Sequence, residues 1–268
     1  MRLIRAANLL IAATGVLAGG WIALTRLALP KELVFATVSG MALGAAGNTW
    51  NDIQDVVADR VNRPRRPLAA GTVSRGVADL ILFDGALLGL AFAALASGWQ
   101  TLAAIAALAV MLVYSPLLKP QPLLGNVAVA LVAGSPPFYG ALAVGRPVAG
   151  IVPWVLAAWL HLMREIVKDI EDEAGDRAIG RRTLPIVVGR RPAAVIAAGV
   201  GLLFVPGSLL LPRAAAYGTP YYLIALFAQL AVMVAATWLL LDKVDRVSAL
   251  LKGAMVIGLV ALVAGKVV

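Results

Sequence analysis

The sequence has no cysteine and a single histidine, His161, among its 268 residues. The absence of cysteine excludes disulfides, thiol catalysis, iron–sulfur clusters and cysteine-ligated zinc, and one histidine argues equally against a histidine-based metal site. Charged residues make up only 14% of the chain, against roughly 25% in an ordinary soluble domain. Because 61% of the residues are hydrophobic and no long polar linker divides the chain, we expect residues 1–268 to form one polytopic membrane domain.

The chain is basic, with 23 Lys and Arg against 14 Asp and Glu and a net charge of +9. In a soluble protein this excess would suggest nucleic acid as a partner. Here the basic residues lie in short segments between apolar runs, an arrangement that anionic lipid headgroups favour. We therefore expect contacts with membrane lipids and no binding of nucleic acid.

Uncharged runs of about 20 residues, the length that a membrane-spanning helix needs, recur along the chain. One run is too long for a single span and is divided at a turn signal, Ser97-Gly98, so the sequence predicts an all-α integral membrane protein with nine transmembrane helices. The runs are Ala6 to Thr25, Leu33 to Asn51, Gly85 to Leu118 (divided), Pro120 to Gly145, Pro147 to Met163, Pro192 to Pro212, Ala214 to Leu241 and a shorter one, Val247 to Gly265, interrupted by Lys252.

The basic residues are distributed unevenly between the two sides that nine spans define. The side of the N-terminus holds 17 of the 23 Lys and Arg residues, the other side holds five, and Lys252 lies inside the last span. By the positive-inside rule the first side is cytoplasmic. We expect a multi-pass protein of the cell membrane with its N-terminus in the cytoplasm.

Most of the acidic residues lie in two short stretches at the cytoplasmic ends of predicted spans. The stretches hold nine of the 14 acidic residues: Asp52, Asp55, Asp59, Glu165, Asp169, Glu171, Asp172, Glu173 and Asp176. Three Asp residues of the first stretch match three of the second at a constant offset of 117 positions, and a basic pair follows each stretch. This match suggests an internal duplication.

On a continuous helix, positions i, i+3 and i+7 fall within roughly 60° of one another, so each Asp triad is expected to line one helix face. Asn48 and Asn51 extend the first face by a turn. Three carboxylates on one face repel each other and need a cation. Oxygen-only clusters suit Mg²⁺, which commonly bridges to phosphate oxygens, so the two faces predict a diphosphate site with two or more metal ions. The alternative is a set of solvated charges paired with neighbouring arginines.

These motifs resemble those of the UbiA superfamily of intramembrane prenyltransferases. Residues 51–59 read NDIQDVVAD, which has the family's N-D-x-x-D-x-x-x-D form, and residues 172–176 read DEAGD, its D-x-x-x-D form. Residues 66–71 read RPLAAG, and residues 114–119 read YSPLLK before Gly125-Asn126, both similar to further family segments. Within the superfamily, residues 164–176, REIVKDIEDEAGD, and 183–185, TLP, look most like the digeranylgeranylglyceryl phosphate synthases, the archaeal ether-lipid branch.

The resemblance implies nine helices around a central cavity, with the two acidic motifs facing each other under a cytoplasmic cap. It implies Mg²⁺ as the cofactor, with ligands among Asn51, Asp52, Asp55, Asp59, Asp169, Asp172 and Asp176. The expected catalytic residues are Asp55, Asp59, Asp172, Asp176 and Lys119. The expected substrate-binding residues are Asn48, Asn51, Arg63, Arg66, Tyr114, Asn126, Arg164 and Lys168.

The implied reaction transfers a prenyl group, geranylgeranyl in this branch, from a polyprenyl diphosphate to the hydroxyl of geranylgeranylglyceryl phosphate, forming an ether. Arg164 and Lys168 lie one helical turn apart, and either bind the acceptor phosphate or pair with neighbouring acidic residues. His161 is expected to have a packing role.

Prenylation of an aromatic acceptor in quinone biosynthesis is the nearest alternative, since it would use the same metal site. A secondary transporter is a different class, but its carboxylates would usually lie near the membrane midplane.

Overall fold

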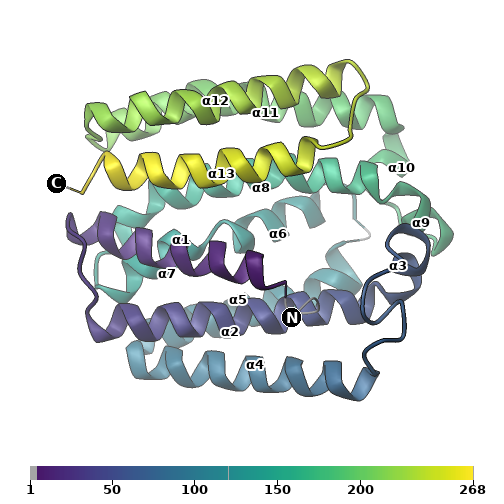
Figure 1. Ribbon diagram of the computed structural model, residues 1–268, viewed down its shortest axis with the longest axis horizontal. Coiled ribbons are helices and arrows are strands. Elements are labelled where there is room, and N and C mark those ends of the chain that lie inside the picture. The colour runs from purple at the N-terminus through teal and green to yellow at the C-terminus, as the bar shows by residue number, and fades with distance from the viewer. Residues whose placement is uncertain (1–4, 120, 268) are drawn as a thin grey trace.

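The computed structural model describes residues 5–119 and 121–267, and every regular element in those residues is helical (Figure 1). Pro120, where one predicted span begins, lies outside the described residues. The first part of the chain forms α1 (Ala6–Leu24), α2 (Lys31–Gln54), α3 (Val56–Asn62), α4 (Arg75–Ala96), α5 (Gly98–Val113), the π-helix η1 (Tyr114–Leu118), α6 (Leu124–Ala133) and α7 (Pro136–Ala143). The second part forms the 3₁₀ helix η2 (Pro147–Gly150), α8 (Ile151–Glu171), α9 (Glu173–Ala178), α10 (Leu184–Val188), α11 (Arg190–Ala214), α12 (Thr219–Leu240) and α13 (Val247–Ala264). The all-α prediction is confirmed.

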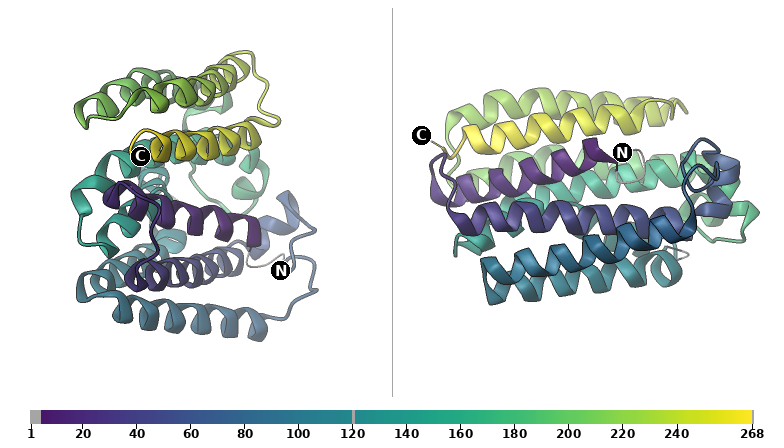
Figure 2. Two further views of the ribbon diagram at one scale, coloured as in Figure 1. Left: turned by 60° about the vertical axis from the view of Figure 1, so that its left-hand side comes forward. Right: turned by 60° about the horizontal axis from the view of Figure 1, so that its bottom comes forward.

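The long helices run side by side in layers, and the short helices α3, α9 and α10 gather at one end of the bundle, at the right in Figure 1 (Figures 1 and 2). In the first half of the chain, α2 packs against α1, α4 and α5, and α1 packs against α7. In the second half, α8, α11, α12 and α13 pack around the largest cluster of buried apolar residues. The halves meet where α6 contacts α8 and α1 contacts α13.

Six helices in the described part of the chain are long and apolar enough to cross a membrane, and the bent pair α6 and α7 raises the number to seven if it forms one span. The six are α1, α4, the combined η2 and α8, α11, α12 and α13. Two further helices match predicted spans but fall outside this set: α2, with 24 residues, and α5, with 16. The protein is therefore a multi-pass, all-helical membrane protein, and the count of nine spans stays a prediction.

Local capping explains where two helices begin. Ser97 accepts a hydrogen bond from the backbone N–H of Gln100 at 3.1 Å, which starts α5 and confirms the expected turn there. Ser74 accepts from the backbone N–H of Val77 at 3.3 Å, so α4 begins at Arg75 rather than at Gly85. The later start predicted from uncharged residues was wrong, because a helix end is set by its cap and not by its charge content.

The charged end of α8 also belongs to the helix. The uncharged run ended at Met163, whereas α8 continues to Glu171. The helix therefore carries the charged residues of the second acidic stretch from the membrane interior out toward α9. Its last two turns supply part of the candidate site.

Candidate active site

The two acidic stretches meet at one end of the bundle, where α3 contacts α9 (Figure 1). Asn62, at the end of α3, donates its Nδ2–H to the backbone carbonyl of Asp172 at 2.8 Å. Its Oδ1 accepts the backbone N–H of Gly175 at 2.8 Å. A Cβ at Gly175 would lie 2.3 Å from Asn62 Nδ2 and 2.7 Å from the carbonyl oxygen of Ala58, so only glycine fits. The two motifs lie side by side, as expected, and Asn62 forms hydrogen bonds between them.

Each Asp triad spans a break between two helices. Asp55 separates α2 from α3 with φ −94° and ψ 3°. Asp172 separates α8 from α9 with nearly the same angles, φ −95° and ψ 4°. The expectation of one continuous helix face per triad was wrong, because the chain changes direction at the middle Asp of each. The break turns both short helices toward one another across the end of the bundle.

Arg181 joins the two motifs through their carboxylates. One guanidinium nitrogen lies 2.7 Å from Asp55 Oδ1, and the other lies 3.1 Å from Asp176 Oδ1. Lys119 Nζ lies 2.6 Å from the second oxygen of Asp55. Asp55 is thus held between two cations, and one arginine spans the distance between the first and second motifs.

Further arginines pair with the remaining carboxylates. Arg66 lies 2.6 Å from Asp59 Oδ2 and 3.2 Å from Asp52 Oδ1. Arg5 also forms an ion pair with Asp52. Arg63, which follows α3, reaches across to Asp172 at 2.7 Å. Cations from four different segments therefore converge on the acidic motifs.

Because these carboxylates are buried, their charged form needs a neighbouring cation. It raises the pKa of Asp176 above its usual value, against the opposing effect of the nearby cations. It likewise raises the pKa of Asp59, despite the Arg66 guanidinium beside it. Burial disfavours the charge of Arg181 too, but Asp55 and Asp176 outweigh this effect and raise its pKa. If one cation leaves, a carboxylate here must gain another cation or a proton.

The segment after α5 positions two more of the predicted residues. The helix widens into the π-helix η1, which begins at Tyr114, and Lys119 follows it directly. A π-turn of this kind adds a residue to a helix and often occurs at functional sites. Asn126, at the start of α6, donates its Nδ2–H to Asp169 Oδ2 at 2.7 Å. The resemblance-based assignment of this segment to the site is consistent with that geometry.

A cavity of about 390 Å³ opens from the acidic motifs into the bundle, within the usual size range of ligand pockets. Its walls are mostly apolar and come from α1, α2, α5 to α8 and α11 to α13. The predicted site residues that line it are Asn48, Asn51, Asp55, Arg63, Arg66, Tyr114, Lys119, Arg164, Lys168 and Asp172. The predicted residues outside its lining are Asp52, Asp59, Asn126, Asp169 and Asp176. Asn48 and Asn51 each also interact within the protein.

Arg164 and Lys168 share one carboxylate. Lys168 Nζ lies 2.7 Å from Glu165 Oε2, and Arg164 lies 3.2 Å from Glu165 Oε1. The structure thus shows the ion pairing that was the alternative to phosphate binding. Since both residues also line the cavity, binding of an acceptor phosphate stays a prediction.

Sequence reasoning did not identify Arg181, Asn62 and Arg5 as site residues. For Arg181 a signal was present, because it belongs to the basic pair that follows the second acidic stretch, as Arg66 belongs to the pair after the first. Asn62 and Arg5 gave no such signal. Their partners are 110 and 47 residues away in the chain, so only the fold reveals them.

The donor set fits a hard divalent cation, although no finished metal cage is present. Among the described residues, no three His or acidic side chains lie close enough together to hold a metal ion, because Arg and Lys side chains stand between the carboxylates. Asp176 Oδ2 is buried and has no hydrogen-bond partner in the same part of the chain. Buried carboxylate oxygens, one of them unsatisfied and several paired with Arg and Lys side chains, are suitable Mg²⁺ ligands.

The pattern of the UbiA prenyltransferase family matches residues 12–260. This chain belongs to the UbiA prenyltransferase family. The UbiA-family chain is 46% identical over 167 residues to the digeranylgeranylglyceryl phosphate synthase of Pyrococcus abyssi, an alignment that covers 62% of this chain and 60% of that relative. It is 37% identical over 282 residues to the enzyme of the same name from Halobacterium salinarum, covering 100% of this chain and 97% of the relative.

Solved structures of the family share the fold. A structure of digeranylgeranylglyceryl phosphate synthase aligns with a TM-score of 0.78 and 26% identity, covering 99% of this chain and 96% of the other. A UbiA homologue from Archaeoglobus fulgidus, bound to GPP and Mg²⁺, aligns with a TM-score of 0.70 and 20% identity, covering 97% of this chain and 98% of that one. The UbiA fold therefore extends over nearly the whole chain.

Proposed function

We propose that this UbiA-family chain is a digeranylgeranylglyceryl phosphate synthase, an ether-lipid prenyltransferase. In the reaction, the C1–oxygen bond of geranylgeranyl diphosphate breaks, diphosphate leaves, and C1 bonds to the hydroxyl oxygen of geranylgeranylglyceryl phosphate, which loses its proton. The observation that carries the proposal is the meeting of two acidic motifs, bridged by Arg181, at the end of an apolar cavity. The similarity to synthases of that name supports the choice of acceptor.

Mg²⁺ is the proposed cofactor, and it supplies neutralisation of the negative charge that builds on the departing diphosphate. We assign Asn51, Asp55 and Asp59 to one ion and Asp172 and Asp176 to another, with Asp52 and Asp169 as further ligands or as acceptors behind them. The unsatisfied Asp176 Oδ2 supports this assignment. So does the bridge of Arg181 between Asp55 and Asp176, because the two carboxylates share one positive charge. The Archaeoglobus fulgidus homologue with bound GPP and Mg²⁺ has the same fold.

The cations of the cavity would bind and orient the diphosphate. Lys119, Arg63 and Arg66 line the cavity beside the motifs, and each is paired with a carboxylate that the metal ions would otherwise engage. Arginine offers two parallel N–H donors to phosphate oxygens, and lysine a compact point charge. Once the carboxylates bind metal, these side chains are released to bind the leaving diphosphate. Their fixed positive charges stabilise the departing group without reorganising during the reaction.

The apolar walls would hold the prenyl chain and keep water from the reactive carbon. Ionisation at C1 creates an allylic cation, which water would capture if it reached the site. Apart from the charged end, the cavity is lined mainly by aliphatic side chains and glycines of the bundle. The acceptor hydroxyl would therefore be the nucleophile that reaches the cation. Tyr114, whose backbone carbonyl accepts the N–H of Lys119 at 2.7 Å, lines the cavity and would stand beside the reacting centre.

We further propose nine membrane spans within one domain, with the N-terminus and both acidic motifs on the cytoplasmic side. The excess of basic residues on that side supports this orientation. The nearly identical backbone angles at Asp55 and Asp172 support an internal duplication. A cysteine introduced at exposed Arg65 should react with membrane-impermeant maleimide only from the cytoplasmic side of the vesicle.

The proposed function is tested by comparing the product formed with different acceptors. The purified protein, reconstituted in nanodiscs with Mg²⁺ and geranylgeranyl diphosphate, receives either geranylgeranylglyceryl phosphate or a panel of hydroxybenzoate-type acceptors. We expect prenylated product only from the glyceryl lipid, detected by mass spectrometry. Product from the aromatic acceptors alone would instead assign the chain to quinone biosynthesis. Solute uptake into vesicles that survives loss of Asp55 and Asp172, without diphosphate release, would identify a transporter.

A further inference from the structure

Lys252 is a charged residue in the second turn of an apolar membrane helix. It lies in α13 (Val247–Ala264), whose remaining residues are uncharged, and its side chain lines the central cavity with Met255 and Leu259. A lysine at membrane depth is costly and is retained mainly where it has a function. The prediction of spans from uncharged runs assigned no role to Lys252.

Lys252 has no ion pair and no hydrogen bond to any of the described residues, unlike the other two lysines of the cavity. Lys119 pairs with Asp55 at 2.6 Å, and Lys168 pairs with Glu165 at 2.7 Å. The Lys252 ammonium is therefore available for a ligand. Its three N–H donors suit an anionic oxygen group.

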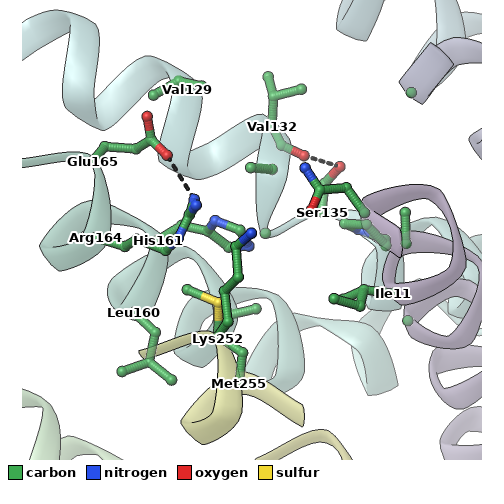
Figure 3. A pocket seen from close by; sticks show the side chains of 18 of the residues that line it. Ile11, Val129, Val132, Ser135, Leu160, His161, Arg164, Glu165, Lys252 and Met255 are labelled. Atoms are coloured by element: carbon green, nitrogen blue, oxygen red, sulfur yellow. Dashed lines mark hydrogen bonds and ion pairs between the residues drawn. The ribbon is translucent and has the colours of Figure 1, made fainter. Parts of the chain in front are cut away.

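The neighbours of Lys252 are basic. Figure 3 shows its side chain extending from α13 toward His161 and Arg164 of α8. Arg164, Lys168 and Arg5 are near enough to repel its charge, and Glu165 is the one acidic residue among its leading electrostatic partners. Arg5 is paired with Asp52, so Lys252, Arg164 and Lys168 face a single carboxylate, that of Glu165, which leaves two positive charges uncompensated in an apolar cavity.

Two buried nitrogen atoms of this group also lack partners. Arg164 Nε and His161 Nδ1 form no hydrogen bond with any of the described residues. Buried polar atoms are nearly always satisfied, and exceptions often mark a place where a ligand or ion binds. Figure 3 draws His161, Arg164 and Lys252 around the same cavity. A ligand with several oxygen acceptors would satisfy the two nitrogens and the ammonium together.

We infer that Lys252 is a substrate-binding residue that, with His161, Arg164 and Lys168, binds the phosphomonoester of the acceptor lipid. This inference rests on the proposed function and specifies its acceptor. A phosphomonoester carries about −1.5 to −2 charges at neutral pH, which matches the two uncompensated positive charges of the group. The carboxylate of a benzoate-type acceptor carries a single negative charge and would leave one cation unbalanced.

The position of the group separates it from the diphosphate site. Arg164 and Lys168 precede Asp172 by eight and four residues, which is roughly 12 Å and 6 Å along a helix axis at 1.5 Å per residue. The acceptor phosphate would thus lie deeper in the bundle than the metal-binding motifs. Its glycerol hydroxyl would extend from there toward the prenyl C1 held beneath the motifs.

The test uses Lys252→Met, which removes the charge and suits an apolar helix, and Lys252→Arg, which retains the charge. Lys243→Met is the matched control, since Lys243 is exposed and lies outside the cavity lining. Transfer from geranylgeranyl diphosphate is measured with the phosphorylated acceptor and with dephosphorylated geranylgeranylglycerol. Metal-free binding of each lipid to the protein in nanodiscs is measured by calorimetry. Apparent melting temperatures establish that the variants are folded.

We expect Lys252→Met to raise both the KM and the Kd of the phosphorylated acceptor about 10-fold or more, as for a lost hydrogen bond between charged groups. The KM of geranylgeranyl diphosphate and the Kd of the dephosphorylated lipid should not change. Lys252→Arg should recover most of the affinity. Equal losses for the two acceptors, or no loss for the phosphorylated one, would overturn the inference.

The binding measurement separates this inference from the proposed function. If the wild type transfers to neither glyceryl lipid but binds the phosphorylated one in a manner that depends on Lys252, the proposed function fails and the binding site stands. If the wild type transfers to the phosphorylated lipid and Lys252→Met has no effect, the proposed function stands and the binding site fails. Inorganic phosphate binding as tightly as the lipid would overturn the assignment to the acceptor.

Discussion

Replacing Arg181 by methionine removes the cation that joins the two acidic motifs. The side chain is only 9% exposed, and its partners Asp55 and Asp176 are 11% and 2% exposed. Loss of one partner from a buried ion pair costs roughly 3–5 kcal/mol. Because Lys119 remains 2.6 Å from Asp55, we expect the lower end, about 3 kcal/mol. At 2–4 °C per kcal/mol for a protein of about this size, the apparent melting temperature should fall by about 6–12 °C.

The assay follows thermal unfolding of the detergent-solubilised protein with and without Mg²⁺. Without the metal, Arg181→Met should melt well below the wild type. With Mg²⁺, the difference should shrink, because the bound ion supplies the positive charge that the two carboxylates have lost. The matched control is Arg182→Met, since Arg182 is exposed and forms no ion pair with any of the described residues.

Two results would refute the contribution assigned to the bridge, and a third would contradict the placement of a cation between the motifs. One is an Arg181→Met variant that melts within about 2 °C of the wild type without metal, which would mean that the bridge adds little. The other is an equal destabilisation of Arg182→Met, which would assign the effect to the segment rather than to the bridge. A melting temperature that does not respond to Mg²⁺ in Arg181→Met would contradict the placement of a cation between the motifs.

Three further predictions concern the same end of the bundle. Asp55→Asn and Asp176→Asn should each lower turnover at least about 100-fold with the fold retained by circular dichroism, whereas Asp79→Asn, in an exposed pair with an arginine, should remain active; near-normal turnover of both site variants would refute the two-motif site. Gly175→Ala should destabilise the protein by about 1–3 kcal/mol, since its Cβ would lie 2.3 Å from a side-chain nitrogen, whereas Gly199→Ala, with open space around it, should melt like the wild type. Chelation with EDTA should abolish diphosphate release and added Mg²⁺ should restore it; release that persists in EDTA would exclude a metal-dependent reaction.

The residues that sequence reasoning located are those whose chemistry is concentrated in short segments. The two acidic stretches were conspicuous because only five of the 14 acidic residues lie elsewhere in the chain, and the structure places the stretches together through α3 and α9. Lys119 entered through its resemblance to a family segment and lies 2.6 Å from Asp55. Local composition and spacing suffice for such residues, although their catalytic roles stay predictions until variants are measured.

The features that the sequence did not predict depend on capping or on contacts between distant segments. The start of α4 is set by the Ser74 cap, and the breaks at Asp55 and Asp172 interrupt what the spacing suggested was a continuous face. Arg181 is 126 residues from Asp55 along the chain. No periodicity or motif connects them, because their proximity follows only from the way α9 and the segment after it fold back onto α3.

The hydrogen bonds of Asn62 hold the two acidic motifs together without using their carboxylates. Asn62 binds main-chain atoms of the second motif, the carbonyl of Asp172 and the N–H of Gly175, and leaves every carboxylate uninvolved. The distance between the motifs is therefore fixed by groups that neither ionise nor bind metal. Arginines, metal ions and a diphosphate can replace one another among the carboxylates during a catalytic cycle while the two halves of the enzyme keep their alignment.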